Sequence, residues 1–268
     1  MIESNRPVID VAVILAGGFG TRLSEETISK PKPMVEIGGM PIIWHIMKFY
    51  SSFGVNRFII CCGYKSLVLK KFFADYYMEK SDITFDLKSN DIHVHSETSE
   101  PWTVTLVDTG IQTGTGGRLK RVANYLEDVE SFAFTYGDGL CDVDLNELVS
   151  FHKANNRLAT VTGVYPPGRF GSIVFDKDSG AVTEFLEKPR GDGGLISGGF
   201  FILGKEVLNL IDGDSTSFEL EPLDKLVALN QICVYEHQGF WHAMDTLRDK
   251  NHLNELWNRG AAPWKVWD

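Results

Sequence analysis

The chain has 268 residues, of which 43% are hydrophobic and 23% charged, and this composition is ordinary for a soluble globular protein. Its formal net charge of −10 argues against broad binding to nucleic acid, which needs a basic face. It contains no run of about eighteen apolar residues, so we expect no membrane span. The polar first residues and four cysteines without a C-x-x-C spacing favour a reduced, cytoplasmic protein.

The first half of the chain alternates between strand and helix patterns. Continuous apolar runs predict buried strands, and apolar residues three or four apart predict helices. We therefore expect strands at 11–15, 57–62, 103–108 and 131–136, with short strands within 83–95. We expect helices at 41–53, 66–78, 118–127 and 144–155. This alternation is typical of a largely parallel sheet with helices on both faces.

Short strands dominate from residue 158 onward. Strand patterns occur at 158–165, 172–176, 181–187, 198–204 and 232–236, and helical patterns at 206–211, 221–229 and 246–257. The sequence thus predicts an α/β fold with a Rossmann-like, three-layer, mixed but mostly parallel sheet and a small C-terminal β/α elaboration. We expect one domain over 1–268, with a first half at about 8–157 and a C-terminal part at about 158–268.

The first predicted strand ends in a glycine-rich loop that suits a phosphate ligand. Glycines let the backbone approach a phosphate, and Thr21 and Arg22 follow them directly. A second cation, Lys32, lies between Pro31 and Pro33, which stiffen its backbone. A dinucleotide-binding loop is disfavoured, because the third small residue is missing, and a P-loop is excluded because no G-K-[ST] follows.

Two further segments carry candidate functional residues. A second glycine–threonine loop at 111–117 precedes Arg118, which would begin a helix, where anions are favoured. Lys120 and Arg121 suit a solvated helix face. Asp138 lies between two glycines directly after a predicted strand. This position suits a carboxylate at the carboxyl edge of the sheet. Asp245 lies far away in the sequence, and spacing alone cannot link it to Asp138.

These motifs together resemble the sugar-phosphate nucleotidyltransferases, which join a sugar 1-phosphate to a nucleoside triphosphate and release pyrophosphate. The resemblance rests on an ordered set of motifs along nearly the whole chain: G-G-F-G-T-R-L and P-K-P-M within 11–34, T-G-G-R-L-K-R at 115–121, T-Y-G-D-G at 135–139, P-P-G-R-F-G at 166–171, E-K-P at 187–189, G-G-F-F at 198–201, G-F-W at 239–241 and M-D-T-L-R-D-K at 244–250.

The resemblance implies a role for each matched residue. Arg22, Lys32 and Asp138 would be catalytic, and Asp138 and Asp245 would hold Mg²⁺ through hard oxygen ligands. The implied nucleotide-binding residues are Leu15, Ala16, Gly17, Gly18, Phe19, Gly20, Thr21, Arg22, Lys32, Thr113, Gly117, Arg118 and Gly137. The implied sugar-phosphate-binding residues are Gly171, Glu187, Lys188, Ser197, Gly198 and Gly199. The half at 8–157 would bind the nucleotide, and the part at 158–268 the sugar.

Within this family the resemblance favours CTP and α-D-glucose 1-phosphate as substrates, with CDP-glucose and pyrophosphate as products. Thymidylyl or uridylyl transfer, or another hexose 1-phosphate, remains an alternative. A non-catalytic sugar-nucleotide sensor on the same fold is a further alternative, although a sensor does not need the predicted metal pair. The tryptophan-rich tail A-P-W-K-V-W and the oligomeric state of relatives favour a homo-oligomer. We treat His93, His95, His237, His242 and the tryptophans as structural residues.

Overall fold

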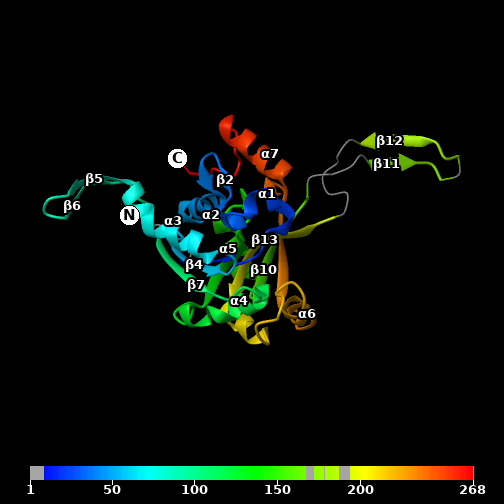
Figure 1. The fold of residues 1–268 in the computed structure, drawn as a ribbon. Coiled ribbons are helices and arrows are strands. Elements are labelled where there is room, and N and C mark those ends of the chain that lie inside the picture. The colour runs from blue at the N-terminus through cyan, green and yellow to red at the C-terminus, as the bar shows by residue number, and fades with distance from the viewer. Residues whose placement is uncertain (1–8, 167–171, 178, 187–193, 268) are drawn as a thin grey trace, which may run out of the picture.

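A seven-stranded sheet forms the centre of the protein (Figure 1). The computed structural model describes residues 9–166, 172–177, 179–186 and 194–267. The strands lie in the order β14-β10-β13-β8-β1-β4-β7, and only β13 runs antiparallel to its neighbours. Their bounds are β1 (Val11–Ala16), β4 (Arg57–Cys62), β7 (Thr103–Asp108), β8 (Ser131–Tyr136), β10 (Ala159–Val164), β13 (Ile196–Gly204) and β14 (Ile232–His237).

The central strands form because their side chains are apolar on both faces. On β1, Ile14 belongs to the hydrophobic core on one side of the sheet and Val13 to the core on the other. Val13 pairs in register with Ile59 of β4 and Phe134 of β8, so the buried residues of three parallel strands form rows. Parallel strands buried on both faces have this continuous apolar pattern.

Helices cover both faces of the sheet, as the sequence predicts. One core includes residues of α2 (Ile42–Ser52), α3 (Ser66–Glu79), α5 (Leu145–Asn155) and α7 (Leu247–Asn258). The other includes residues of α4 (Thr115–Arg121) and α6 (Glu221–Ala228). Figure 1 shows α2 and α7 on the opposite side of the sheet from α4 and α6. The predicted three-layer α/β fold is therefore confirmed.

Short elements complete the chain. Short helical segments of one or two turns are α1 (Ser24–Thr27), η1 (Thr21–Leu23), η2 (Lys32–Met34), η3 (Ala123–Tyr125) and η4 (Lys205–Leu210). Four two-stranded sheets pair β2 (Glu36–Ile37) with β3 (Met40–Pro41), β5 (Ser81–Asp86) with β6 (Asp91–Glu97), β9 (Gly139–Cys141) with β15 (Trp241–Ala243), and β11 (Ser172–Phe175) with β12 (Val182–Leu186). The β5–β6 and β11–β12 ribbons project from the body on opposite sides (Figure 1).

The predicted helix at 118–127 is wrong in its bounds. The helix is α4, which begins at Thr115 and ends at Arg121. Its first glycines do not form an open loop, because the backbone of Asp214 and Thr216 lies against them and leaves no room for a side chain. The Gly114 N–H donates to the Asp214 carbonyl at 2.7 Å. The glycines of this motif thus allow close packing as well as loop conformation.

The tryptophan-rich tail packs inside its own chain. Trp264 is fully buried, and its indole N–H donates to Nδ1 of His45 on α2 at 3.4 Å. Trp257 and Trp267 also pack against the His45 ring. The tail therefore gives no support of its own to the predicted homo-oligomer, which stays a prediction. In the part of the chain that the structure describes, no helix is both long and apolar enough to cross a bilayer.

Candidate active site

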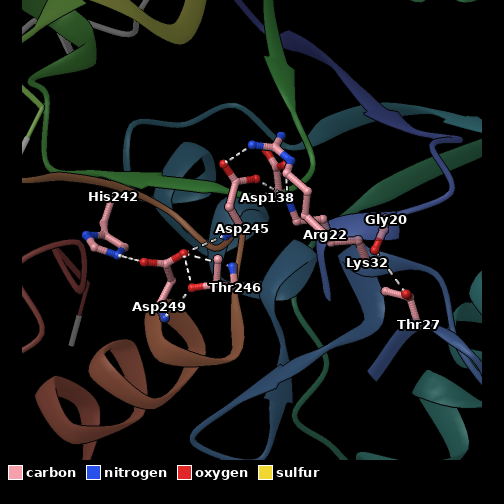
Figure 2. Close-up of polar contacts among 9 residues, drawn as sticks. All are labelled: Gly20, Arg22, Thr27, Lys32, Asp138, His242, Asp245, Thr246 and Asp249. Atoms are coloured by element: carbon pink, nitrogen blue, oxygen red, sulfur yellow. Dashed lines mark hydrogen bonds and ion pairs between the residues drawn. The ribbon is translucent and has the colours of Figure 1, made fainter. Parts of the chain in front are cut away.

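The glycine-rich loop after β1 forms one wall of a cleft of about 450 Å³. Gly20 has a φ of 65°, a left-handed conformation that favours glycine, and it precedes η1. The Thr27 hydroxyl donates to the Gly20 carbonyl at 3.0 Å and fixes the turn (Figure 2). This turn directs Thr21 and Arg22 along the edge of the cleft.

The cleft contains most of the predicted nucleotide-binding residues. Its lining includes Leu15, Ala16, Gly17, Gly18, Phe19, Gly20, Thr21, Arg22, Lys32, Thr113, Arg118, Gly137 and Asp138. Gly117 of the predicted set is not among the lining residues. It lies inside α4 and its backbone N–H donates to the Thr216 carbonyl at 3.1 Å, so it contributes to packing beneath the cleft.

Two cations and two carboxylates meet at one side of this cleft (Figure 2). The ammonium of Lys32 contacts Asp138 Oδ2 at 2.6 Å and Asp245 Oδ1 at 2.7 Å. Arg22 contacts the other oxygen of Asp245 at 2.6 Å. Lys32 is largely buried, whereas the side chain of Arg22 is 72% exposed. The exposed cation is therefore at the entrance and the buried cation is inside.

The small β9–β15 sheet explains how two carboxylates so far apart in the sequence become neighbours. Ala243 pairs with Gly139 at the end of the ladder, and the Met244 N–H donates to the Asp138 carbonyl at 2.9 Å. Asp138 directly precedes β9, and Asp245 lies two residues after the end of β15. The pairing of the two strands therefore makes the two carboxylates neighbours. The pairing depends on tertiary structure, which is why sequence spacing does not reveal it.

The two carboxylates suit a divalent cation. Both direct an oxygen at the same point, which the Lys32 ammonium occupies in this structure. Carboxylate oxygens are hard ligands, and a cation bound through one or two carboxylates together with substrate phosphates is the usual arrangement for Mg²⁺. The donor set thus fits a metal ion that enters together with a phosphate ligand.

Comparison with known proteins agrees with this geometry. A family model for nucleotidyl transferases matches residues 11–242. The glucose-1-phosphate cytidylyltransferase of Salmonella typhi is 58% identical over 257 residues, which cover 96% of this chain and 99% of the relative. The chain belongs to the nucleotidyl transferase family. The resemblance inferred from its motifs is confirmed.

Two further comparisons extend this result. The probable glucose-1-phosphate cytidylyltransferase of Bacillus subtilis is 42% identical over 96% of this chain and 99% of its own. Among solved structures, HddC from Yersinia pseudotuberculosis superposes with a TM-score of 0.66 at 26% identity, covering 93% of this chain and 100% of that one. Both the sequence and the fold of this chain therefore agree with its membership of the family.

Arg118 of this nucleotidyl transferase is buried beside the cleft. Its guanidinium donates to oxygens of three chain segments within 3.2 Å: Cys62 O, Thr109 Oγ1, Gly110 O, Gly17 O and Ile111 O. Burial lowers the pKa of this group. These contacts make Arg118 a clamp between the first glycine loop and the loop at 109–111. Its predicted direct contact with phosphate stays a prediction.

A smaller cavity of about 90 Å³ adjoins the cleft and is lined in part by residues from the C-terminal part of the chain. Its lining includes the predicted residues Ser197, Gly198 and Gly199, and Asp138 lines both cavities. The Trp241 indole N–H donates to the Gly198 carbonyl at 2.7 Å, so this tryptophan supports the cavity wall. Gly171, Glu187 and Lys188, the other predicted sugar-binding residues, lie outside the described residues.

Sequence reasoning missed two parts of the site. Ser217 lines the cleft, and neighbouring Glu219 accepts hydrogen bonds from Tyr136 and from Thr115. The glycines at 114–117 were the available signal, since they require a close backbone neighbour. Lys120 and Arg121 are exposed, as expected for a solvated helix face, and they also contact the segment at 211–214.

His237 also has a structural partner. Its Nε2 lies 2.8 Å from Asp142 Oδ1, which also accepts the Phe240 N–H at 2.7 Å. Cys141 lies nearby, and burial raises the pKa of its thiol to about 12. The contacts of Asp142 with His237 and Phe240 connect the turn between β14 and β15 to the residue that follows β9.

Proposed function

We propose that this enzyme transfers a cytidylyl group from CTP to α-D-glucose 1-phosphate and gives CDP-glucose and pyrophosphate. The observation that carries the proposal is the convergence of Lys32, Arg22, Asp138 and Asp245 at the side of a glycine-walled cleft. The choice of CTP and glucose 1-phosphate is supported by the activity named for the Salmonella typhi relative. Thymidylyl or uridylyl transfer is the runner-up.

The reaction needs alignment and charge neutralisation rather than a protein nucleophile. A phosphate oxygen of the sugar 1-phosphate attacks the α-phosphorus of CTP, a new P–O bond forms, and the bond to the departing pyrophosphate breaks. Lys32 would neutralise charge at the α-phosphate, and Arg22 would bind the leaving phosphates, since a guanidinium can contact two oxygens at once. Preorganised charges of this kind supply much of enzymatic rate enhancement.

Asp138 and Asp245 would hold the metal, for which we propose Mg²⁺. When bound, the ion supplies Lewis-acid polarisation and neutralises phosphate charge. The backbone from Leu15 to Thr21, with Thr113 and Gly137, would hold the nucleotide. Ser197, Gly198 and Gly199 would contact the glucose phosphate, and Glu187 and Lys188 would bind sugar hydroxyls and phosphate.

A substrate panel tests this proposal. Pyrophosphate release is measured with CTP, UTP, dTTP, ATP and GTP, each paired with glucose, mannose and galactose 1-phosphate in the presence of Mg²⁺. We expect the pair of CTP and glucose 1-phosphate to exceed every other pair at least about tenfold, which corresponds to about 1.4 kcal/mol of transition-state discrimination. Faster turnover with UTP or dTTP would contradict the choice of base, and no release with any pair would favour a sensor.

A further inference from the structure

Asp249, in the first turn of α7, is connected to the candidate metal ligand Asp245 (Figure 2). Its Oδ2 accepts the backbone N–H of Asp245 at 3.1 Å and that of Thr246 at 2.8 Å. The same oxygen accepts the Thr246 hydroxyl at 2.8 Å. One carboxylate oxygen thus binds the backbone N–H groups of Asp245 and of the residue that follows it.

A second contact fixes Asp249 itself. Nε2 of His242 lies 3.1 Å from the other oxygen, Oδ1. His242 belongs to β15, the strand that leads into Asp245, so Asp249 connects both sides of the candidate ligand. The side chains of His242 and Asp249 are 14% and 22% exposed, which limits competition from water.

The direction of the Asp245 side chain depends on this backbone. On the β15 side, the Met244 N–H is fixed to the Asp138 carbonyl at 2.9 Å. Among the described residues, the Asp245 N–H has one other acceptor, the Ala243 carbonyl at 3.1 Å, within the same short connection. The Asp249 carboxylate therefore connects the Asp245 backbone to α7 as well as to the turn.

We propose that Asp249 is a positioning residue, which orients the Asp245 carboxylate toward Asp138 so that the two can share one divalent cation. The inference rests on the proposed function in that Asp245 binds the ion. Groups that orient metal ligands are often worth about 10- to 100-fold in metal affinity or activity. Asp249 contacts neither the cleft lining nor Lys32 among the described residues, so it acts through Asp245.

The competing explanation is that Asp249 merely caps α7. Thr246 is the N-cap, and its hydroxyl accepts the Asp249 N–H at 3.3 Å in a reciprocal capping box. Thr246→Ala removes this hydroxyl, and with it the bond that the hydroxyl donates to Asp249 Oδ2, but leaves both backbone contacts to Asp249. It is therefore the matched control, since it weakens the helix cap without releasing Asp245.

The experiment compares the full-length wild type with Asp249→Ala, Asp249→Asn and Thr246→Ala. Mn²⁺ binding in the presence of CTP is followed by electron paramagnetic resonance, and pyrophosphate release is titrated with Mg²⁺. We expect Asp249→Ala to weaken Mn²⁺ binding and to raise the half-saturating Mg²⁺ concentration about 10- to 100-fold. Asp249→Asn, whose amide oxygen accepts the same backbone N–H groups, should restore both values to within about threefold.

Two results would overturn the inference. One is an Asp249→Ala enzyme that binds Mn²⁺ as tightly as the wild type. The other is a Thr246→Ala enzyme with the same weakening, because helix capping would then explain it. Failure of the proposed function is distinguishable: a wild type without cytidylyl transfer still reports, through Mn²⁺ binding, whether Asp249 supports the Asp245 site.

Discussion

Lys32 is the residue on which the charges of the candidate active site depend. Its ammonium bridges Asp138 and Asp245, and its exposed fraction is only 9%. Pro31 and Pro33 flank it and restrict the backbone that carries it. Two carboxylates that share one cation repel each other once it leaves, so a phosphate that draws Lys32 away would also favour entry of a metal ion.

Substitution of Lys32 tests this arrangement. We expect Lys32→Met to lower kcat/KM for pyrophosphate release by about 10²- to 10³-fold, the range seen when one preorganised group at a reacting centre is removed. The chain should stay folded, as measured by circular dichroism. Lys30→Met is the matched control, since Lys30 contacts Glu36 at 2.9 Å outside the cleft. A Lys32→Met enzyme within tenfold of the wild type would refute the catalytic role.

The predictability of the site differs between its residues. Arg22 and Lys32 follow from the local motif, because a glycine loop and a proline-flanked lysine are visible in the sequence. The meeting of Asp138 with Asp245 follows only from family resemblance, since it depends on the β9–β15 ladder. Asp249 carries a capping-box signal, but its bond to the Asp245 N–H depends on the turn between β15 and α7.

At the scale of elements, the strands of the sheet are the most predictable. β4, β7 and β8 have the predicted bounds, because their apolar runs end at glycine or aspartate. The bounds of helix α4 differ from the prediction. Its glycines suggest a loop when considered alone, but the segment around Asp214 and Thr216 packs against them and makes a helix stable there. Contacts between distant segments overrode local preference.

The docking of α2 on the C-terminal tail has a consequence for stability. His45 of α2 is fully buried, its Nε2 contacts the Ile37 carbonyl at 2.8 Å, and its Nδ1 accepts the Trp264 N–H. Burial lowers the pKa of His45 to about 4. Protonation would place an N–H opposite the Trp264 N–H, so the neutral form is the one that fits.

This contact predicts acid sensitivity. Because the folded pKa lies below the unfolded value of 6.5, the unfolded chain binds a proton first, and stability falls as the pH drops from about 7 to 4. The total contribution is on the order of 3 kcal/mol. Urea denaturation at pH 7.5 and pH 5 should show a smaller loss in His45→Gln than in the wild type. His95→Gln, on the exposed β6, should match the wild type.

At the scale of the whole molecule, the predicted halves at 8–157 and 158–268 share one sheet. β13 from the second half inserts between β10 and β8, and it alone reverses direction. Phe201 of β13 pairs with Phe134 of β8, and their rings lie 5.6 Å apart. The cleft proposed for the nucleotide and the cavity proposed for the sugar share Asp138 and thus lie on a continuous scaffold.

The shared sheet predicts that the chain unfolds as a unit. Phe201→Ala removes a fully buried ring that contacts both halves, and we expect it to lower the free energy of unfolding by about 3–5 kcal/mol. Circular dichroism and tryptophan fluorescence should report one coincident urea transition, shifted equally in both. Phe85→Ala, on the projecting β5–β6 ribbon, should shift it by no more than about 0.5 kcal/mol. Two separate transitions, with only one sensitive to Phe201→Ala, would mean that the halves are independently stable and that β13 joins them without coupling their folding.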